Sequence, residues 1–338
     1  NPSIDLTKLA LEVTLTEGAN ISPDPARVMD YSHPQKFTVT SEDGNWHKEY
    51  SVIIDTFDLP LRYDFEHYEL NETGKYQVFF EETQGTALFK QYIWASGNSG
   101  FALTGVGRNP QEYPTVSIEN GIDGSRAIKL ETKSTGQFGE TVKMPIAAGN
   151  LFLGSFDVNN AVQKPLKATR FGLPFGKKPL QLKGYYKYTP GTQPFKAKDK
   201  NGNTVTIPGQ EDEGDIYAVL YEAAELDGKA LDGNNVLTSE NIVALARVEV
   251  EKKDEFTAFH VDFHYGSRIP IDWPKFIQDQ RDPSDDGTAP YLSFSEEKMK
   301  NYEYNLAVVF TSSKYGAYFA GSVGSTLCID KVEIVCEK

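Results

Sequence analysis

The stretch QLKGYYKYTPG, residues Gln181–Gly191, decides the fold class. Large apolar and polar side chains alternate along it until the Pro-Gly pair ends the run. Because successive side chains of a strand point to opposite faces, Leu182 shares its face with Tyr186 and Tyr188. Tyr185 lies on the other face, among lysine and glutamine. Leu182 marks the first face as the inner one, so the stretch predicts a strand of a half-buried sheet.

Similar short runs recur along the chain, separated by Gly, Pro and Asp. Aromatic residues make up 12% of the 338 residues and there are only 3 Met, a balance that favours strands over helices. The helical suggestions are short, such as Ser295–Asn301. We therefore expect an all-β protein whose larger part is a jelly-roll β-sandwich. The expected strands in that part are RYDFEHYEL, YQVFFEE, IWASG, AIKLETK, LFLGSFDV, LQLKGYYKY, IYAVLYEAA, IVALARVEV, FTAFHVDFHY, YNLAVVFTSS and TLCIDKVEIVC.

Residues 1–60 form a separate small unit in this interpretation. Their strand-like runs are LALEVTLTEG, KFTVTSEDGN and KEYSVIID, and the EDGN turn joins the last two in a hairpin. The pattern predicts a short immunoglobulin-like sandwich, with Asp58–Pro60 as its exit linker. The jelly roll then covers residues 61–338.

The net charge of the chain limits the kinds of molecule that it is expected to bind. The formal net charge is −14, whereas nucleic-acid-binding proteins present basic surfaces to phosphates. An acidic chain is also unsuited to an anionic membrane surface. The balance favours a neutral ligand or a cation.

The two cysteines, Cys328 and Cys336, fall in the last strand-like run. Eight residues of extended chain separate them by roughly 26 Å, and a disulfide needs Cα atoms within about 7 Å. We expect two free thiols, and their equal parity predicts that both lie on one face of the strand.

Four stretches of the larger unit carry a resemblance to a known family. They are WASGNSGFA at Trp94–Ala102, AAGNLFLGSF at Ala147–Phe156, KPLQLKGYYKYTPG at Lys178–Gly191, and SSKYGAYFAGSVGSTLCIDKVEI at Ser312–Ile334. With these stretches in order, residues 62–338 resemble the putative carbohydrate metabolism domain of surface lipoproteins from glycan-degrading gut bacteria. The N-terminal region, ending in TVTSEDGNWHKEYSV, resembles the immunoglobulin-like modules that precede such domains.

The resemblance implies a jelly roll similar to carbohydrate-binding modules and a polysaccharide or oligosaccharide ligand. It implies an extracytoplasmic lipoprotein, at the cell surface or in the periplasm, tethered to the outer membrane by a lipid upstream of Asn1. Other glycan-utilisation surface proteins are its expected partners. The resemblance supplies no catalytic residues, so these stay unknown.

Aromatic side chains are the first candidates for holding a sugar, because pyranoses present a C–H patch on which rings stack. Tyr185 is the tyrosine whose parity predicts exposure, while Leu182 draws Tyr186 and Tyr188 toward the core. A bulge before Pro190 would change that parity. The alternative is that all three rings are structural.

Trp94 and Asn98 form the second candidate group, since a ring beside an amide can stack on a sugar and bond its hydroxyls. The Gly- and Ser-rich segment Ser312–Ser325 adds Ser313 and Phe319 as residues that could line a glycan cleft. The alternatives are a core tryptophan and a tight structural loop.

A structural calcium site is a further expectation from glycan-binding jelly rolls, in which acidic groups from the two chain ends often meet. The matching residues here are Asp64, Glu66 and Asp330. Carboxylates are the ligands that calcium prefers. The alternative is ordinary backbone capping, and no other cofactor is expected.

Other polar groups are expected to be solvated. His260, Asp262 and His264 alternate opposite an apolar face, which predicts an outer face. The acidic runs Glu211–Asp215 and Asp279–Asp286 are interpreted as solvated insertions.

Catalysis has no clear signature in this chain. Glycosidases use two carboxylates, but among 48 acidic residues no spacing singles out a pair. Asp272 and Trp273, in PIDWPK, stand between two prolines that suggest a rigid connection. Our first hypothesis is therefore a non-catalytic glycan-binding protein. The alternatives are a glycoside hydrolase on the same scaffold and a structural or adhesion protein of the cell surface.

Overall fold

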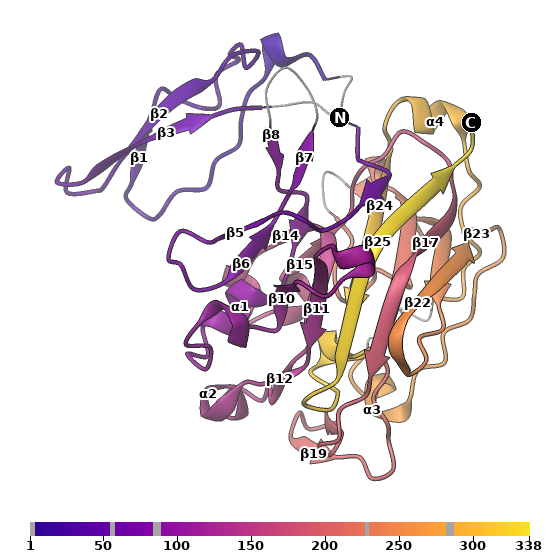
Figure 1. Ribbon diagram of the computed structural model, residues 1–338. Helices are drawn as coiled ribbons and strands as arrows, with labels where there is room; N and C mark the ends of the chain where they lie inside the picture. Colours follow the sequence, from indigo (N-terminus) through magenta and orange to yellow (C-terminus); the bar gives the residue numbers. More distant parts are fainter. Residues whose placement is uncertain (1–3, 55–57, 84–88, 227–229, 282–286) are drawn as a thin grey trace. The chain divides into compact units, whose positions relative to one another are not determined.

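The computed structural model describes residues 4–54, 58–83, 89–226, 230–281 and 287–338 (Figure 1). Its chain divides into two compact units, Asn1–Asp58 and Leu59–Lys338. Antiparallel strands make up most of the regular structure in both units, so the all-β prediction is confirmed. No helix in the described ranges is long and apolar enough to cross a membrane.

The smaller unit carries a three-stranded antiparallel sheet in the order β1–β2–β3. The buried rings of Tyr31 and Phe37 form its core. The predicted EDGN turn joins β2 to β3, and Gly44 there has a φ of +69° that suits glycine. The described residues of this unit contain no second sheet. Its elements are η1 (Leu6–Lys8), β1 (Asn20–Ser22), β2 (Gln35–Thr40) and β3 (His47–Val52).

The larger unit contains two large antiparallel sheets. The six-stranded sheet runs β10–β11–β25–β17–β22, with β4 paired to β25. Its strands are β4 (Arg62–Tyr63), β10 (Thr115–Ile118), β11 (Ala127–Glu131), β17 (Pro179–Thr189), β22 (Lys253–Asp262) and β25 (Thr326–Cys336). The eight-stranded sheet runs β15–β14–β24–β20–β21–β23, with β16 on β24 and β9 on β14. Its strands are β9 (Trp94–Ala95), β14 (Asn150–Phe156), β15 (Thr169–Phe171), β16 (Leu173–Pro174), β20 (Asp215–Glu222), β21 (Ile242–Val248), β23 (His264–Tyr265) and β24 (Tyr304–Thr311).

Short hairpins and helices connect the sheets. The hairpins are β5 (Tyr68–Leu70) with β6 (Gln77–Phe79), β7 (Glu81–Thr83) with β8 (Phe89–Gln91), β12 (Lys133–Ser134) with β13 (Ile146–Ala147), and β18 (Lys196–Lys198) with β19 (Thr204–Thr206). The α-helices are α1 (Asn98–Ala102), α2 (Gly136–Thr141), α3 (Lys275–Gln278) and α4 (Glu296–Lys300), the last where the sequence predicts a helix. The 3-10 helices are η2 (Pro110–Glu112), η3 (Ile122–Gly124), η4 (Val158–Asn160), η5 (Pro165–Lys167), η6 (Ala224–Leu226) and η7 (Gly316–Tyr318).

Strand β17 has the alternation that its sequence predicts. Leu182, Tyr186 and Tyr188 are buried, and Tyr185 is half-buried on the opposite face. The Tyr188 hydroxyl donates a hydrogen bond to the carbonyl of Ser312, just beyond β24. Tyr188 therefore joins the two sheets across the core of the sandwich.

The last strand, β25, has an irregularity that the sequence does not reveal. Lys331 has a φ of +47°, and the pairing with β17 shifts by one residue beside it. The inward set consequently changes from Leu327 and Ile329 to Val332 and Ile334. Cys328 and Cys336 are both free thiols, as predicted. The prediction that they share a face is wrong, because the bulge between them reverses the alternation.

The eight-stranded sheet is covered on both faces, because every residue of β20 is buried. One face of β20 carries Tyr217, Val219 and Tyr221, which pack against buried residues such as Leu237 and Tyr291 from the connecting loops. The other face turns toward the six-stranded sheet. Loops thus close over one side of this sheet, and the pocket described next lies among them.

Candidate functional site

A pocket with a volume of about 200 Å³ lies over the loop-covered face of the eight-stranded sheet. Its floor is aromatic, with Phe152 from β14, Phe171 from β15 and Tyr217 from β20. The rings of Phe152 and Phe171 meet edge to face with centroids 4.8 Å apart. We call this the apolar pocket. Its size is below the roughly 300–1,000 Å³ of sites for drug-sized ligands, so it suits a compact group.

A tryptophan forms part of the wall. Trp273, from PIDWPK, is half-buried and lines the apolar pocket together with Arg281 and Tyr318. The Arg281 guanidinium lies 4.2 Å from the centre of the Trp273 ring, and its Nη1 donates a 2.9 Å hydrogen bond to the Tyr318 hydroxyl. These contacts fix the orientation of the tryptophan before any ligand arrives.

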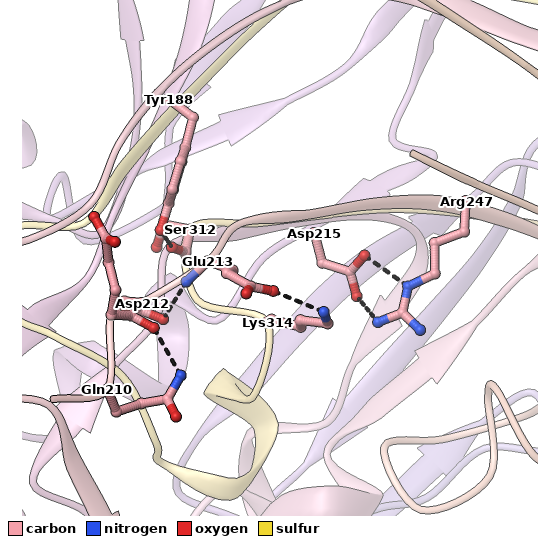
Figure 2. A network of polar contacts seen from close by, with 9 residues as sticks. Tyr188, Gln210, Asp212, Glu213, Asp215, Arg247, Ser312 and Lys314 are labelled. Carbon is pink, nitrogen blue, oxygen red and sulfur yellow. Dashed lines mark hydrogen bonds and ion pairs between the residues drawn. The ribbon is translucent and has the colours of Figure 1, made fainter. Parts of the chain in front are cut away.

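Two ion pairs lie along one side of the pocket, and Figure 2 shows their side chains. Asp215 accepts two hydrogen bonds from the Arg247 guanidinium, at 2.9 and 2.7 Å. Next to this pair, Lys314 contacts Glu213 at 2.7 Å. Asp215 is only 3% exposed. A fork-to-fork pair of this kind is held rigidly, so it gives the pocket a fixed polar wall.

Asp212, beside these pairs, holds together the segment that supports the wall. Its Oδ2 accepts from the Ser313 hydroxyl at 2.6 Å, the Ser325 hydroxyl at 2.7 Å and the Ser322 backbone N–H at 2.8 Å. Burial raises the pKa of Asp212 to about 6, although these hydrogen bonds act in the opposite direction. The expectation that the acidic run Glu211–Asp215 is solvated is therefore wrong for Asp212 and Asp215, which are both buried. Asp212 is 2% exposed and ties its loop to the Gly- and Ser-rich segment.

Comparison with known proteins identifies the larger unit. The family model described as putative carbohydrate metabolism domain matches residues 64–335. The chain belongs to this family. A second model, described as SGBP, N-terminal, matches residues 1–54. The resemblance drawn from the four sequence stretches is confirmed.

Two solved structures resemble the whole or most of the chain. One, described as a putative glycoside hydrolase from Bacteroides thetaiotaomicron, is 41% identical with a TM-score of 0.78, over 100% of this chain and 89% of that one. The other, described as a putative glycoside hydrolase from Bacteroides vulgatus, is 36% identical with a TM-score of 0.67, over 83% of this chain and 100% of that one. A search of the curated proteins finds no match.

Two of the residues expected to hold a glycan line the apolar pocket of this carbohydrate metabolism domain. They are Ser313 and Phe319, both from the Gly- and Ser-rich segment. The Ser313 hydroxyl is already bonded to Asp212 and Thr132. Phe319 is half-buried and carries the Lys198 ammonium 4.5 Å from its ring centre. Tyr185 lies elsewhere, on the outer face of the six-stranded sheet.

Trp94 and Asn98 are placed in the core, which corrects the expectation that they face a ligand. Trp94 is 4% exposed, and its ring packs 5.0 Å from Tyr63 and 5.4 Å from Phe65. Asn98 is fully buried and exchanges hydrogen bonds with the backbone N–H and carbonyl of Thr115. Tyr186 and Tyr188 are likewise buried core residues. Their rings therefore present no open face to a sugar.

The indole N–H of Trp94 donates a 2.8 Å hydrogen bond to Glu81, a buried carboxyl group. Burial raises the pKa of Glu81 from 4.5 to about 7. A carboxyl group with a raised pKa stabilises the folded state below its unfolded pKa, and that contribution is lost as the pH rises through the folded pKa. The shift corresponds to about 3 kcal/mol.

Glu81→Gln is therefore expected to gain stability relative to the unmodified protein as the pH rises. Urea unfolding of both proteins at about pH 4 and about pH 8 measures this difference, which should grow by about 3 kcal/mol toward high pH. Glu82→Gln, at an exposed neighbouring carboxylate, is the control. A difference that is equal at both pH values would contradict the assignment.

The three residues of the calcium expectation each accept hydrogen bonds from the protein. Asp330 accepts from the Ile122 backbone N–H and the Ser125 hydroxyl, and Glu66 accepts from the Arg126 backbone N–H. Asp64 accepts a hydrogen bond from the backbone N–H of Glu66. These hydrogen bonds agree with the alternative of backbone capping, and the calcium site stays a prediction. In the described part of the chain, no group of three His, Cys, Asp or Glu residues could hold a metal.

Several residues of the apolar pocket were missed by the sequence analysis. His260, Asp262 and His264 are exposed, as predicted, and play no part in it. Trp273 carried a usable signal, since a tryptophan between prolines is held rigidly in a loop. Tyr217 and Arg247 carried none, because each stands in a long apolar strand that reads simply as core.

Proposed function

We propose that this protein is a non-catalytic glycan-binding protein and that the apolar pocket holds part of the sugar. The observation that carries the proposal is the combination of the fixed Trp273 ring with an aromatic floor and one polar wall. Aromatic rings pack on the C–H face of a pyranose, and a few fixed polar groups orient its hydroxyls. Membership of a carbohydrate metabolism family agrees with such a ligand.

A glycoside hydrolase is the second candidate, because both similar solved structures are described as putative glycoside hydrolases. Such enzymes place two carboxyl groups across the scissile bond, one of them with a raised pKa. Among the described residues that line the apolar pocket, Asp215 is the only carboxylate, and Arg247 already binds both its oxygens. The described carboxyl groups with raised pKa, Glu81, Asp212 and Asp330, do not line it. The apolar pocket by itself therefore lacks the carboxyl pair of a glycosidase, and its lining supports binding better than hydrolysis.

Isothermal titration calorimetry against a panel of polysaccharides and oligosaccharides tests the proposal. We expect heat that saturates with successive injections for at least one glycan. Sustained heat after each injection, with new reducing ends in the product, would establish hydrolysis instead. The absence of any binding heat with both neutral and acidic glycans would overturn glycan binding at this site.

Trp273→Ala is expected to weaken binding about 30-fold, the effect of losing about 2 kcal/mol at a central contact. Phe138→Ala removes a second pocket-lining ring that is 40% exposed, so it tests the pocket without disturbing the core. Trp46→Ala is the matched control, because this tryptophan is 52% exposed and belongs to the smaller unit. Unchanged affinity in both pocket variants would contradict the assignment. Loss of binding in Tyr185→Ala alone would move the site to the outer face of the six-stranded sheet.

The extracytoplasmic location is part of the same proposal. It is supported by the resemblance to surface lipoproteins and by the second family model over residues 1–54. A lipid tether is the means of attachment that this resemblance implies.

A further inference from the structure

A second pocket adjoins the apolar pocket. Its volume is about 260 Å³, and its lining is charged: Glu213, Asp215, Arg247, Glu249, Glu251 and Lys314. We call it the polar pocket. Asp215, Arg247 and Lys314 line both pockets. These three side chains therefore form a wall that the two volumes share, and Figure 2 shows them side by side.

The shared wall is rigid. Arg247 on β21 lies opposite Tyr217 in the β20–β21 register, two residues from Asp215, which its guanidinium binds with two hydrogen bonds. Lys314 is fixed in turn by Glu213 at 2.7 Å. A ligand that contacts both sides meets groups that are already in position, which lowers the entropic cost of binding.

The polar pocket differs from its neighbour in chemistry. Four carboxylates line it against two cations, and each of those cations is already paired with a carboxylate. Glu251 is paired outside the pocket with Lys253 at 2.8 Å. The exposed Glu249 makes no hydrogen bond or ion pair with the described residues. Its oxygens are therefore available to accept hydrogen bonds from a ligand.

We infer that the polar pocket is a second subsite for the same glycan, a neutral oligosaccharide of at least two sugar units. The inference rests on the proposed function of the apolar pocket. One sugar packs in the apolar pocket, and the next crosses the Asp215–Arg247 wall into the polar pocket. There its hydroxyl groups donate hydrogen bonds to carboxylates, with Glu249 as the principal acceptor. Hydrogen bonds to an ionised acceptor are stronger than those between neutral groups.

Neutrality of the ligand follows from the sign of the charges. A uronate or sulfated sugar would bring an anion beside Glu249, the carboxylate of this lining that no described cation compensates, and like charges brought together oppose association. The hydroxyls of a neutral sugar complement the same carboxylate. The polar pocket thus selects against acidic glycans.

The test is calorimetry with neutral homologous series: cello-, malto-, manno- and xylo-oligosaccharides, each from one to six units, and oligogalacturonides as the acidic counterpart. We expect Kd to fall at least tenfold between one unit and two or three units of the series that binds. Glu249→Ala should weaken binding of the longer members about tenfold. It should leave the affinity of the single sugar unchanged, because that sugar occupies the apolar pocket. Glu255→Ala, at an exposed glutamate of β22 that lines neither pocket, is the matched control.

The outcomes separate the inference from the proposal on which it rests. Absence of saturable binding for every glycan would overturn both. A second result would overturn only the second subsite. In that result Trp273→Ala weakens binding, but Kd is the same for all oligosaccharide lengths or Glu249→Ala has no effect on Kd. Tighter binding of oligogalacturonides than of any neutral series would also overturn it, since the carboxylates would then not select against an acidic ligand.

Discussion

Asp215→Ala is expected to lower the free energy of unfolding by about 3–5 kcal/mol. Arg247 would lose both hydrogen bonds that hold its guanidinium, while its side chain stays largely shielded from water. A buried cation without its partner destabilises the folded state far more than the intact pair stabilises it. The same substitution removes the wall between the two pockets, so glycan affinity should fall with stability.

Urea unfolding of the two proteins measures the effect. Glu213→Ala is the matched control, because its ion pair with Lys314 has the same 2.7 Å contact but is half-exposed. Water solvates the lysine in that variant, so the loss should be about 1 kcal/mol or less. Equal losses in the two variants would show that the Asp215–Arg247 pair is solvated as well.

Asp212→Ala is expected to cost about 3 kcal/mol or more. The substitution leaves the backbone N–H of Ser322 and the hydroxyls of Ser313 and Ser325 without the oxygen that they share. Each buried donor left unsatisfied costs about 1–3 kcal/mol. Because these serines stand in the segment that carries Phe319, the apolar pocket should loosen and glycan affinity should fall.

Thermal unfolding together with calorimetry on the same samples checks both parts. Asp199→Ala is the control, since this aspartate also accepts two backbone N–H bonds, from Asn201 and Asn203, but in an exposed turn. Water replaces its oxygens, so its effect should be much smaller. A melting temperature for Asp212→Ala as high as that of the control would contradict the role of Asp212 as an anchor.

The fold was predictable because its signals are local. Alternation along β17 assigned Tyr185 and Tyr186 to opposite faces, and burial in the structure agrees. The same rule failed in β25, where the bulge at Lys331 separates Cys328 from Cys336. A bulge is stabilised by pairing with a neighbouring strand, so the residues of one strand do not reveal it.

The site was less predictable because its residues come from distant segments. Trp94 stood out as a rare residue among small polar neighbours, but its core partners Tyr63 and Phe310 lie far away in the chain. Trp273 lines a pocket because Tyr217, 56 residues earlier in the chain, contributes the floor. Strand order across a sheet brings such groups together, and spacing along one sequence does not encode that order.

The position of β25 governs when the larger unit can fold during synthesis. This strand comes last in the sequence among the strands of its sheet, yet it lies between β11 and β17 in the middle of that sheet. The early strand β4 pairs in that sheet with β25 alone. The nascent chain therefore carries unsatisfied strand edges until residues near Cys336 have been made, and such edges associate with other chains. The six-stranded sheet therefore cannot be completed before its final strand, β25, has been made.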